Sequence, residues 1–293
     1  MTNDELKNLS YISKAIGQYS SYVQGGGGNT SVKMGSNKMA IKASGYLLSD
    51  VTETSGFSVV DYNAIRSYLE KPDDDEEEFV RAIKSFVMET DNRPSIETGF
   101  HVLLGDYVIH THSVYANILN CSQEGMGIAE KIFPDSLWIE YATPGRDLTL
   151  KIKDAIAKHN GEPEIIFLQN HGVIISGKNF NNVLNLHESL NNKIKEFLNI
   201  DKDSFDSWNV IKDFSYVKDH ILFPDQVVYT YTGGDSLKSP AAEQTLLAYS
   251  FILATIEQKH LTPNFIDKRN IDILLNMESE KYRIKVMKES GSN

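Results

Sequence analysis

Short apolar segments that alternate with helical periodicities constrain the fold of this chain most. The segments KMAIKAS, GFSVVDY, DYVIHTHS and EIIFLQNHGVIISG are typical of strands. Around them, apolar residues recur at helical spacing in DELKNLSYISKAIGQY, FVRAIKSFVME, GMGIAEKIF, TLKIKDAIAKH and NFNNVLNLHESLNNKIKEFLNI. Because an amphipathic helix must bury one face, helices interleaved with strands predict an α/β domain in which helices cover a sheet.

The pattern changes at about residue 205. The stretch ILFPDQVVYTYTGG predicts a short strand with a Gly-Gly turn, whereas PAAEQTLLAYSFILATIEQK and NIDILLNMESEKYRIKVM predict helices. We therefore expect a main domain over residues 1–204 and a C-terminal extension over residues 205–293 that packs on it.

Composition excludes several classes of function. The formal net charge of -11 disfavours non-specific binding to nucleic acid, because the field of the protein repels polyanions. Cys121 is the only cysteine, which excludes an intrachain disulfide and a four-cysteine metal site. No stretch approaches the roughly 20 apolar residues of a membrane span, and the N-terminal residues do not resemble a signal peptide. We expect a cytoplasmic protein that binds neither nucleic acid nor membranes.

Two histidines in VIHTHS are candidate metal ligands. Side chains alternate between the faces of a strand, so His110 and His112 project from the same face and can reach one ion. A metal site needs at least one more ligand, and without it both are solvated strand residues. His187 lies on the apolar face of its predicted helix and points inward. It is either a core histidine or the partner that the other two require.

Two further features allow a structural or a functional interpretation. Glu97 lies where a polar loop meets an apolar helix, with Asn92 or Ser95 available as a cap. Its carboxylate either stabilises the helix start or serves as a general base. The run GGGGNTSV is either a flexible loop or a backbone that approaches a ligand closely, with the polar groups of Asn29, Thr30 and Ser31 suited to phosphate oxygens. It matches neither the nucleotide-triphosphate loop nor the dinucleotide fingerprint.

The order of these motifs resembles a known family. GGGGNTSVK, KASG, RPSIETGFH, VIHTHS, IEYATPG, NHGVIISG and the helix with His187 follow one another as in the class II aldolase/adducin family, over about the first 200 residues. RPSIET, IEYATPG and LFPDQVVY look closest to rhamnulose-1-phosphate aldolase-like members. No dehydrogenase half follows, so we do not expect the oxidoreductase activity of fused members. The resemblance implies a three-layer α/β/α fold with a central, mainly antiparallel sheet, here with a C-terminal helical extension. It also implies a homo-oligomer, commonly a fourfold tetramer with sites at subunit interfaces.

The resemblance also assigns roles to individual residues. It implies one zinc ion per chain, with cobalt, manganese or nickel as alternatives, held by His110, His112 and His187. Glu97 matches a glutamate that ligates the metal in the empty enzyme and moves a proton in the reaction. Tyr141 matches a tyrosine that acts across a subunit interface. The residues that match the family's phosphate site are Asn29, Thr30, Ser44, Gly45 and Ser95. His171 matches a motif that we interpret as mainly structural, and Ile96 replaces a second phosphate-binding serine.

We therefore expect a zinc-dependent aldolase, a lyase of carbohydrate metabolism. It would cleave a ketose, expected to be phosphorylated, reversibly into a dihydroxyacetone-phosphate-like product and an aldehyde. The alternatives within the family are a sugar-phosphate 4-epimerase and a dehydratase. A non-catalytic binding or scaffold domain, as in adducin, is the alternative from another class, and the presence of His110, His112, His187 and Glu97 argues against it.

Overall fold

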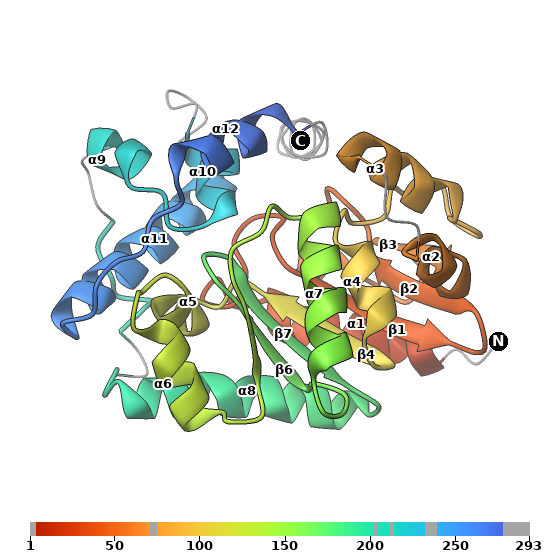
Figure 1. Cartoon of the computed structure of the whole chain (residues 1–293), viewed down its shortest axis with the longest axis horizontal. Helices are drawn as coiled ribbons and strands as arrows, with labels where there is room; N and C mark the ends of the chain where they lie inside the picture. The colour runs from red at the N-terminus through yellow and green to blue at the C-terminus, as the bar shows by residue number, and fades with distance from the viewer. Residues whose placement is uncertain (1–3, 71–74, 202–203, 211–213, 232–238, 278–293) are drawn as a thin grey trace.

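The computed structural model describes residues 4–70, 75–201, 204–210, 214–231 and 239–277. A seven-stranded sheet lies at its centre, in the order β3-β2-β1-β4-β7-β6-β5 (Figure 1). The strands are β1 (Asn29–Met34), β2 (Lys38–Lys42), β3 (Phe57–Asp61), β4 (Tyr107–Thr111), β5 (Leu137–Ile139), β6 (Ile165–Leu168) and β7 (Gly172–Gly177). β5 and β6 are parallel, and the other neighbouring pairs are antiparallel.

Helices cover both faces of this sheet. One face carries α2 (Tyr62–Tyr68), α3 (Glu76–Ser85), α4 (Thr98–Leu103) and α7 (Arg146–Lys158). The other carries α1 (Asp4–Gly17), α5 (Val114–Asn120), α6 (Gly125–Ile132) and α8 (Phe180–Phe197), and the one-turn helix η1 (Leu48–Asp50) packs beside α1. The predicted three-layer α/β/α fold with a mainly antiparallel sheet is confirmed (Figure 1).

Strand β4 lies in the middle of the sheet and separates the two cores. Val108 packs with Phe100 of α4 and with Leu148 and Ile152 of α7. Ile109, the next residue, packs in the opposite core with residues of α8. Because strand side chains alternate between faces, His110 belongs to the α4 and α7 side and Thr111 to the α8 side.

The predicted strand region EIIFLQNHGVIISG is a hairpin. β6 and β7 pair antiparallel, with Leu168 opposite Gly172, and residues 169–171 form the turn. Asn170 adopts the left-handed conformation, with φ of 54°, which asparagine tolerates better than most residues. The turn places His171 at the end of β7, which pairs directly with β4.

The C-terminal part consists of α9 (Phe214–Asp219), α10 (Pro224–Thr230), α11 (Pro240–Gln258) and α12 (Lys268–Asn276). The prediction of a strand in ILFPDQVVY is wrong, because Pro224 begins a helix whose residues are all buried. Proline suits the first helical position, and a fully buried helix shows no periodicity that would distinguish it from a buried strand. The predicted Gly-Gly turn lies outside the described residues, as does the predicted helix beyond residue 277.

The predicted helix over PAAEQTLLAYSFILATIEQK is present as α11, which packs against α5 and α10. Twelve of its 19 residues are buried, and Phe251 and Tyr249 join the large core that also contains α5 and α8 residues. In the described part of the chain, every helix falls short of the length or apolarity that crossing a membrane requires.

A substitution at Gly172, the first residue of β7, tests how closely β4 and β7 pack at this point. An added Cβ would overlap the carbonyl oxygen of Thr111 and lie 3.2 Å from ring carbons of His110 and His112. We expect Gly172→Ala to lower the free energy of unfolding by about 1–3 kcal/mol, measured by urea denaturation. Gly127→Ala is the control, because nothing lies within 4 Å of its added Cβ in α6. Equal stabilities of the two variants would contradict this packing.

Candidate metal centre and active site

His110 and His112 lie together at the end of β4, as their spacing predicts. Their Nε2 atoms are 3.1 Å apart, and the two side chains are 0% and 4% exposed. Phe100 packs edge-on against the His110 ring, with 5.6 Å between ring centroids. The apolar surroundings exclude water and limit the orientations available to the imidazoles.

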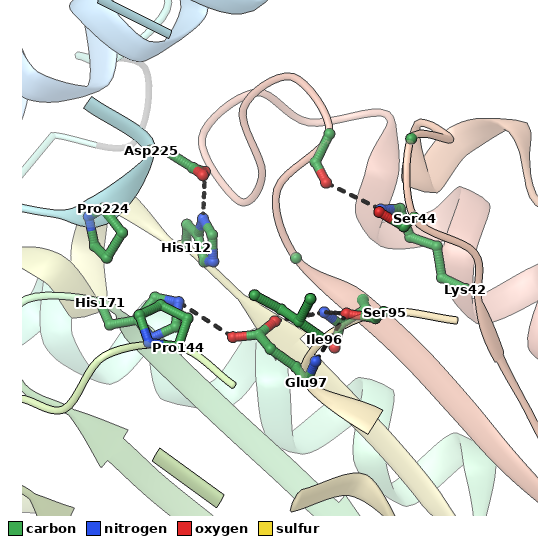
Figure 2. Close-up of a pocket in the computed structure, with 14 residues that line it drawn as sticks. Lys42, Ser44, Ser95, Ile96, Glu97, His112, Pro144, His171, Pro224 and Asp225 are labelled. Carbon is green, nitrogen blue, oxygen red and sulfur yellow. Dashed lines mark hydrogen bonds and ion pairs between the residues drawn. The ribbon is translucent and has the colours of Figure 1, made fainter. Parts of the chain in front are cut away.

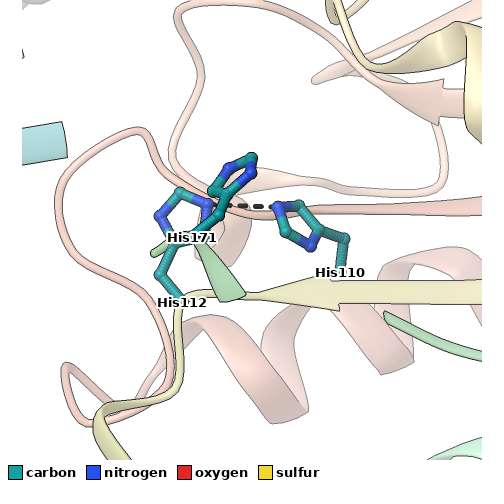
Figure 3. Close-up of side chains that lie close together, drawn as sticks. All are labelled: His110, His112 and His171. Carbon is teal, nitrogen blue, oxygen red and sulfur yellow. Dashed lines mark hydrogen bonds between the residues drawn. The ribbon is translucent and has the colours of Figure 1, made fainter. Parts of the chain in front are cut away.

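His171 completes a cluster of three buried imidazoles (Figure 3). One ring nitrogen from each of His110, His112 and His171 lies within 4.8 Å of the others. The carboxylate of Glu97 faces the same point, with its Oε1 3.6 Å from His110 Nε2 and 3.4 Å from His171 Nε2. Figure 2 shows His112, His171 and Glu97 pointing toward one another from different segments.

The spacing of these four side chains fits a divalent metal ion. Two atoms that bind one zinc ion at about 2.0–2.2 Å with tetrahedral angles lie roughly 3.3–3.5 Å apart. The observed spacings of 3.1, 3.4 and 3.6 Å are close to this value. Glu97 Oε1 is also buried without a hydrogen-bond partner among the described residues, which is costly for a carboxylate oxygen. An imidazole-rich set of this kind suits zinc and related ions.

Hydrogen bonds on the far side of the rings orient two of the imidazoles. His110 Nδ1 lies 3.2 Å from the carbonyl oxygen of Val173, and His112 Nδ1 lies 2.6 Å from Asp225 Oδ2. Both partners can only accept, so we assign the ring proton to Nδ1 in each case. The Nε2 lone pairs of both rings are then directed at the centre of the cluster.

Glu97 immediately precedes α4, but its carboxylate makes no capping bond to that helix. It accepts a hydrogen bond of 2.6 Å from Asn29 Nδ2 through Oε2. The other end of the Asn29 amide accepts from His101 Nε2, and His101 Nδ1 lies 2.7 Å from Ser31 Oγ. Ser95, one of the two predicted caps, accepts a bond from the Glu97 backbone N–H instead. The capping interpretation of the Glu97 carboxylate is therefore wrong.

Burial and charge set the protonation states at neutral pH. Burial lowers the pKa of His110 to about 4 and that of His171 to about 3, so both rings are neutral and able to donate a lone pair. Burial by itself would raise the pKa of Glu97. The neighbouring imidazoles and the bond from Asn29 outweigh burial and lower that pKa to about 2, so the carboxylate is ionised.

The cluster forms one end of a pocket (Figure 2). Four of the five residues that the resemblance assigned to phosphate binding line it, namely Asn29, Ser44, Gly45 and Ser95. Lys42, at the end of β2, also lines the pocket, is 3% exposed and donates a bond of 2.9 Å to the carbonyl oxygen of Gly26. Hydroxyl groups beside the donor Nζ of a lysine are suited to an anion.

Thr30, the fifth predicted phosphate residue, does not reach this pocket. Its hydroxyl lies 2.6 Å from Ser13 Oγ of α1, on the opposite face of the sheet. The physical reason is the alternation of side chains along β1, which directs Asn29 toward the site and the next residue away from it. We therefore remove Thr30 from the candidate site.

His187 does not join the imidazole cluster either. Its Nε2 lies 3.0 Å from Thr111 Oγ1, and its ring packs edge-on against Tyr22. Helix α8 covers the face of the sheet opposite to His110, so His187 meets the residue between the two strand histidines. We replace His187 with His171 in the candidate ligand set.

Tyr141 is absent from the residues that line the pocket. Its ring packs with Ile96 against a cluster that contains Ile221 and Val227 of the C-terminal part. Its backbone N–H donates to Gln169 Oε1 beside the turn that carries His171. The role across a subunit interface that the resemblance implies for Tyr141 stays a prediction.

Three residues of the site were not identified from the sequence as functional. His171 was interpreted as structural, although its position in the turn QNHGV between two strand-like runs is a signal for a site at a strand end. Lys42 ends an otherwise apolar strand, KMAIK, which is an unusual place for a lysine. Asp225 lies in the segment that was mistaken for a strand, and no local signal connects it with His112.

Comparison with known proteins identifies the family of the main domain. A family model described as the class II aldolase and adducin N-terminal domain matches residues 7–198. The chain belongs to this family. Its members thus share the domain that contains the three clustered histidines and Glu97, whereas Asp225 lies beyond the matched residues.

One curated relative is similar to part of this chain. YuxG of Bacillus subtilis (strain 168), an uncharacterized oxidoreductase, is 29% identical over 184 residues, which are 59% of this chain and 26% of YuxG. The present chain thus spans about a quarter of the length of this curated relative.

Solved structures show the same fold. The N-terminal class II aldolase domain of a conserved Thermoplasma acidophilum protein is 22% identical, with a TM-score of 0.60 over 68% of this chain and 94% of that one. YgbL of Klebsiella pneumoniae, described as a candidate aldolase, epimerase or decarboxylase, is 20% identical, with a TM-score of 0.50 over 70% of this chain and 93% of that one. An aldolase II superfamily protein of Pseudomonas syringae is 12% identical, with a TM-score of 0.51 over 88% of this chain and 95% of that one.

Metal content distinguishes the two candidate third ligands. We expect His171→Ala to lose bound zinc, because it removes one of three converging imidazoles, and His187→Gln to retain about as much zinc as the unaltered protein. The measurement is elemental analysis after dialysis against a weak chelator, with circular dichroism as a check on folding. Loss of metal from His187→Gln with retention by His171→Ala would contradict the revised ligand set.

The buried His187 also predicts how stability changes with pH. Burial lowers its pKa from 6.5 to about 3, so between these values the unfolded chain binds a proton that the folded protein does not. Stability is therefore lost as the pH falls through this window, by about 1.4 kcal/mol per pH unit for one proton. We expect His187→Gln to show a shallower loss between about pH 6 and 4 in urea denaturation with chelator present. An unchanged slope would show that His187 does not contribute to acid destabilisation.

Proposed function

We propose that this protein is a divalent-metal-dependent aldolase, a lyase that cleaves a phosphorylated ketose into a dihydroxyacetone-phosphate-like product and an aldehyde. The observation that carries the proposal is the joining of two different environments in one pocket. His112, His171 and the ionised Glu97 line one end, with His110 in the same buried imidazole cluster, and Lys42 with two serines lines the other. Family membership supports this kind of chemistry.

His110, His112 and His171 would hold the metal, which we expect to be zinc at one ion per chain. Three imidazole ligands leave coordination positions open, as in catalytic rather than structural zinc sites. When bound, the ion supplies a Lewis acid beside the carbonyl carbon of the ketose. The ionised Glu97 and the carboxyl group of Asp225 lie near it and would help to balance its charge in a buried site.

Glu97 is the proposed proton carrier. Asn29 holds Oε2, so Oε1 is directed toward the imidazoles, where the reacting carbon would lie. In the synthetic direction Glu97 takes a proton from the carbon that then forms the new carbon-carbon bond. In cleavage the hydroxyl group of the carbon that becomes the aldehyde loses its proton as the carbon-carbon bond breaks, and Glu97 passes a proton to the other carbon of that bond. Its low pKa keeps the carboxylate free of a proton before the synthetic step.

The other end of the pocket would bind the substrate phosphate. Ser44, Gly45, Ser95 and Asn29 offer hydrogen-bond donors, and Lys42 offers the donor Nζ of a buried lysine. Where the resemblance implies a second serine, Ile96 lines the pocket with an apolar side chain that also packs against the C-terminal cluster. We infer that Lys42 compensates for the missing hydroxyl, because a lysine Nζ that lines the pocket can donate hydrogen bonds to phosphate oxygens.

A 4-epimerase or a dehydratase is the second candidate, since both begin with proton transfer or bond cleavage at the same metal-bound substrate. An adducin-like scaffold is disfavoured, because a binding domain gains nothing from burying Glu97 and three imidazoles at one point.

We further propose a cytoplasmic homo-oligomer in which Tyr141 serves a neighbouring site. We also propose that residues 1–204 form the main domain and residues 205–293 the C-terminal extension.

Replacement of Glu97 tests the proposed reaction. The zinc-loaded protein should release a dihydroxyacetone-phosphate-like product from at least one phosphorylated ketose in a panel, detected by coupled oxidation of a reduced nicotinamide cofactor. Glu97→Gln should retain metal and lose about 10²–10⁴-fold in rate, because it removes the proton carrier but leaves the imidazoles. Glu124→Gln is the control, since Glu124 is exposed and bonds to Thr262 far from the pocket.

Product analysis distinguishes the candidates. An epimerised or dehydrated sugar in place of two fragments would support the second candidate function. Absence of metal from the protein even after zinc is added, or undiminished cleavage by Glu97→Gln, would contradict the proposal.

A further inference from the structure

Asp225 comes from α10, in the C-terminal part, yet it lies in the candidate metal centre. Its Oδ2 is 2.6 Å from His112 Nδ1, and the two side chains are 1% and 4% exposed. Pro224 and Asp225 also line the pocket (Figure 2). A carboxylate in this position is a much stronger acceptor for a ring proton than the backbone carbonyl that serves His110.

We propose that Asp225 is a positioning residue that makes His112 a competent metal ligand, so that the C-terminal part of the chain completes the metal centre. The inference rests on the metal-binding part of the proposed function. Asp225 accepts the proton on His112 Nδ1, which fixes the tautomer, directs the Nε2 lone pair at the ion and increases the electron density on that nitrogen.

The surrounding backbone is shaped to allow this contact. An added Cβ on Gly27 would overlap Asp225 Oδ2 and lie 2.8 Å from His112 Nδ1. The hydrogen-bonded pair therefore packs directly against the backbone of the glycine run, where no other residue type fits. The carboxylate is shielded from water on this side, which strengthens its bond to the imidazole.

Two more hydrogen bonds hold the C-terminal part against the same loop. Tyr229 of α10 accepts a bond of 3.1 Å from the backbone N–H of Gly26. Gln244 of α11 accepts one of 2.8 Å from the backbone N–H of Gly25. Helix α10 is thereby fixed at both its Asp225 end and its Tyr229 end to the loop that lies over His112. This placement is more rigid than a contact from a single surface side chain would be.

The test compares three variants for zinc affinity, measured by competition with a chromophoric chelator. Asp225→Ala removes the acceptor and should weaken zinc binding by about 10–100-fold. Asp225→Asn keeps an oxygen acceptor of similar size without the charge, so it should fall between the unaltered protein and Asp225→Ala. Thr230→Val is the control, because Thr230 is buried in the same helix but bonds only within it, to the Gln226 carbonyl.

A second measurement separates positioning from general damage to α10. In a His112→Gln background, Asp225→Ala should have almost no further effect on zinc affinity, because the residue that Asp225 orients is gone. The absorption spectrum of the cobalt-substituted protein should change in Asp225→Ala and stay unchanged in Thr230→Val, since it reports the ligand geometry directly. Asp225→Asn keeps the experiment decisive if Asp225→Ala does not fold.

The outcomes for the inference and for the proposed function differ. Zinc affinity that is unchanged in Asp225→Ala, or reduced equally with and without His112, would overturn the inference. Failure of the unaltered protein to bind zinc would overturn it as well. If Asp225→Ala weakens zinc binding as expected but no phosphorylated ketose is cleaved, the positioning role stands and the proposed aldolase function falls.

Discussion

The alternation of side chains along β4 is the constraint on which the rest of this structure depends. His110 and His112 must project from one face while Thr111 projects from the other, because successive strand residues cannot share a face. Helices cover both faces of this central strand, so the two histidines are buried, and Phe100 of α4 packs against the His110 ring. The metal centre can then be completed only by groups that reach this face of the sheet.

Each of the groups that reach this face arrives at the end of an element. His171 lies in the hairpin turn before β7, Glu97 immediately before α4, and Asp225 in the first turn of α10. Ends of strands and helices are where side chains can converge without disrupting hydrogen-bonded backbone. The sheet therefore fixes where the two strand histidines lie, and the ends of neighbouring elements supply the other side chains of the site.

The sequence predicted the layers of the fold and part of the site, and the successes and errors have a common cause. Patterns within one element were interpreted correctly, such as the shared face of His110 and His112 and the inward direction of His187. Relations between elements were not. The inward direction of a side chain cannot reveal which face of the sheet its helix covers. His187 was therefore interpreted as a metal ligand and His171 as mainly structural.

The glycine run shows the same limit in another way. Its composition left open a flexible loop or a backbone that approaches a ligand closely, and in the structure the close approach is made by the chain itself. Gly25 has a φ of 51° and meets Ala241 of α11, and Gly27 meets the pair of Asp225 and His112. Helices α10 and α11, about 200 residues away in sequence, thus leave no room for a side chain at these two glycines. It follows that the C-terminal part and the glycine run must retain their fit to each other, since a side chain at Gly27 would displace Asp225 and, through it, the imidazole that faces the other two histidines.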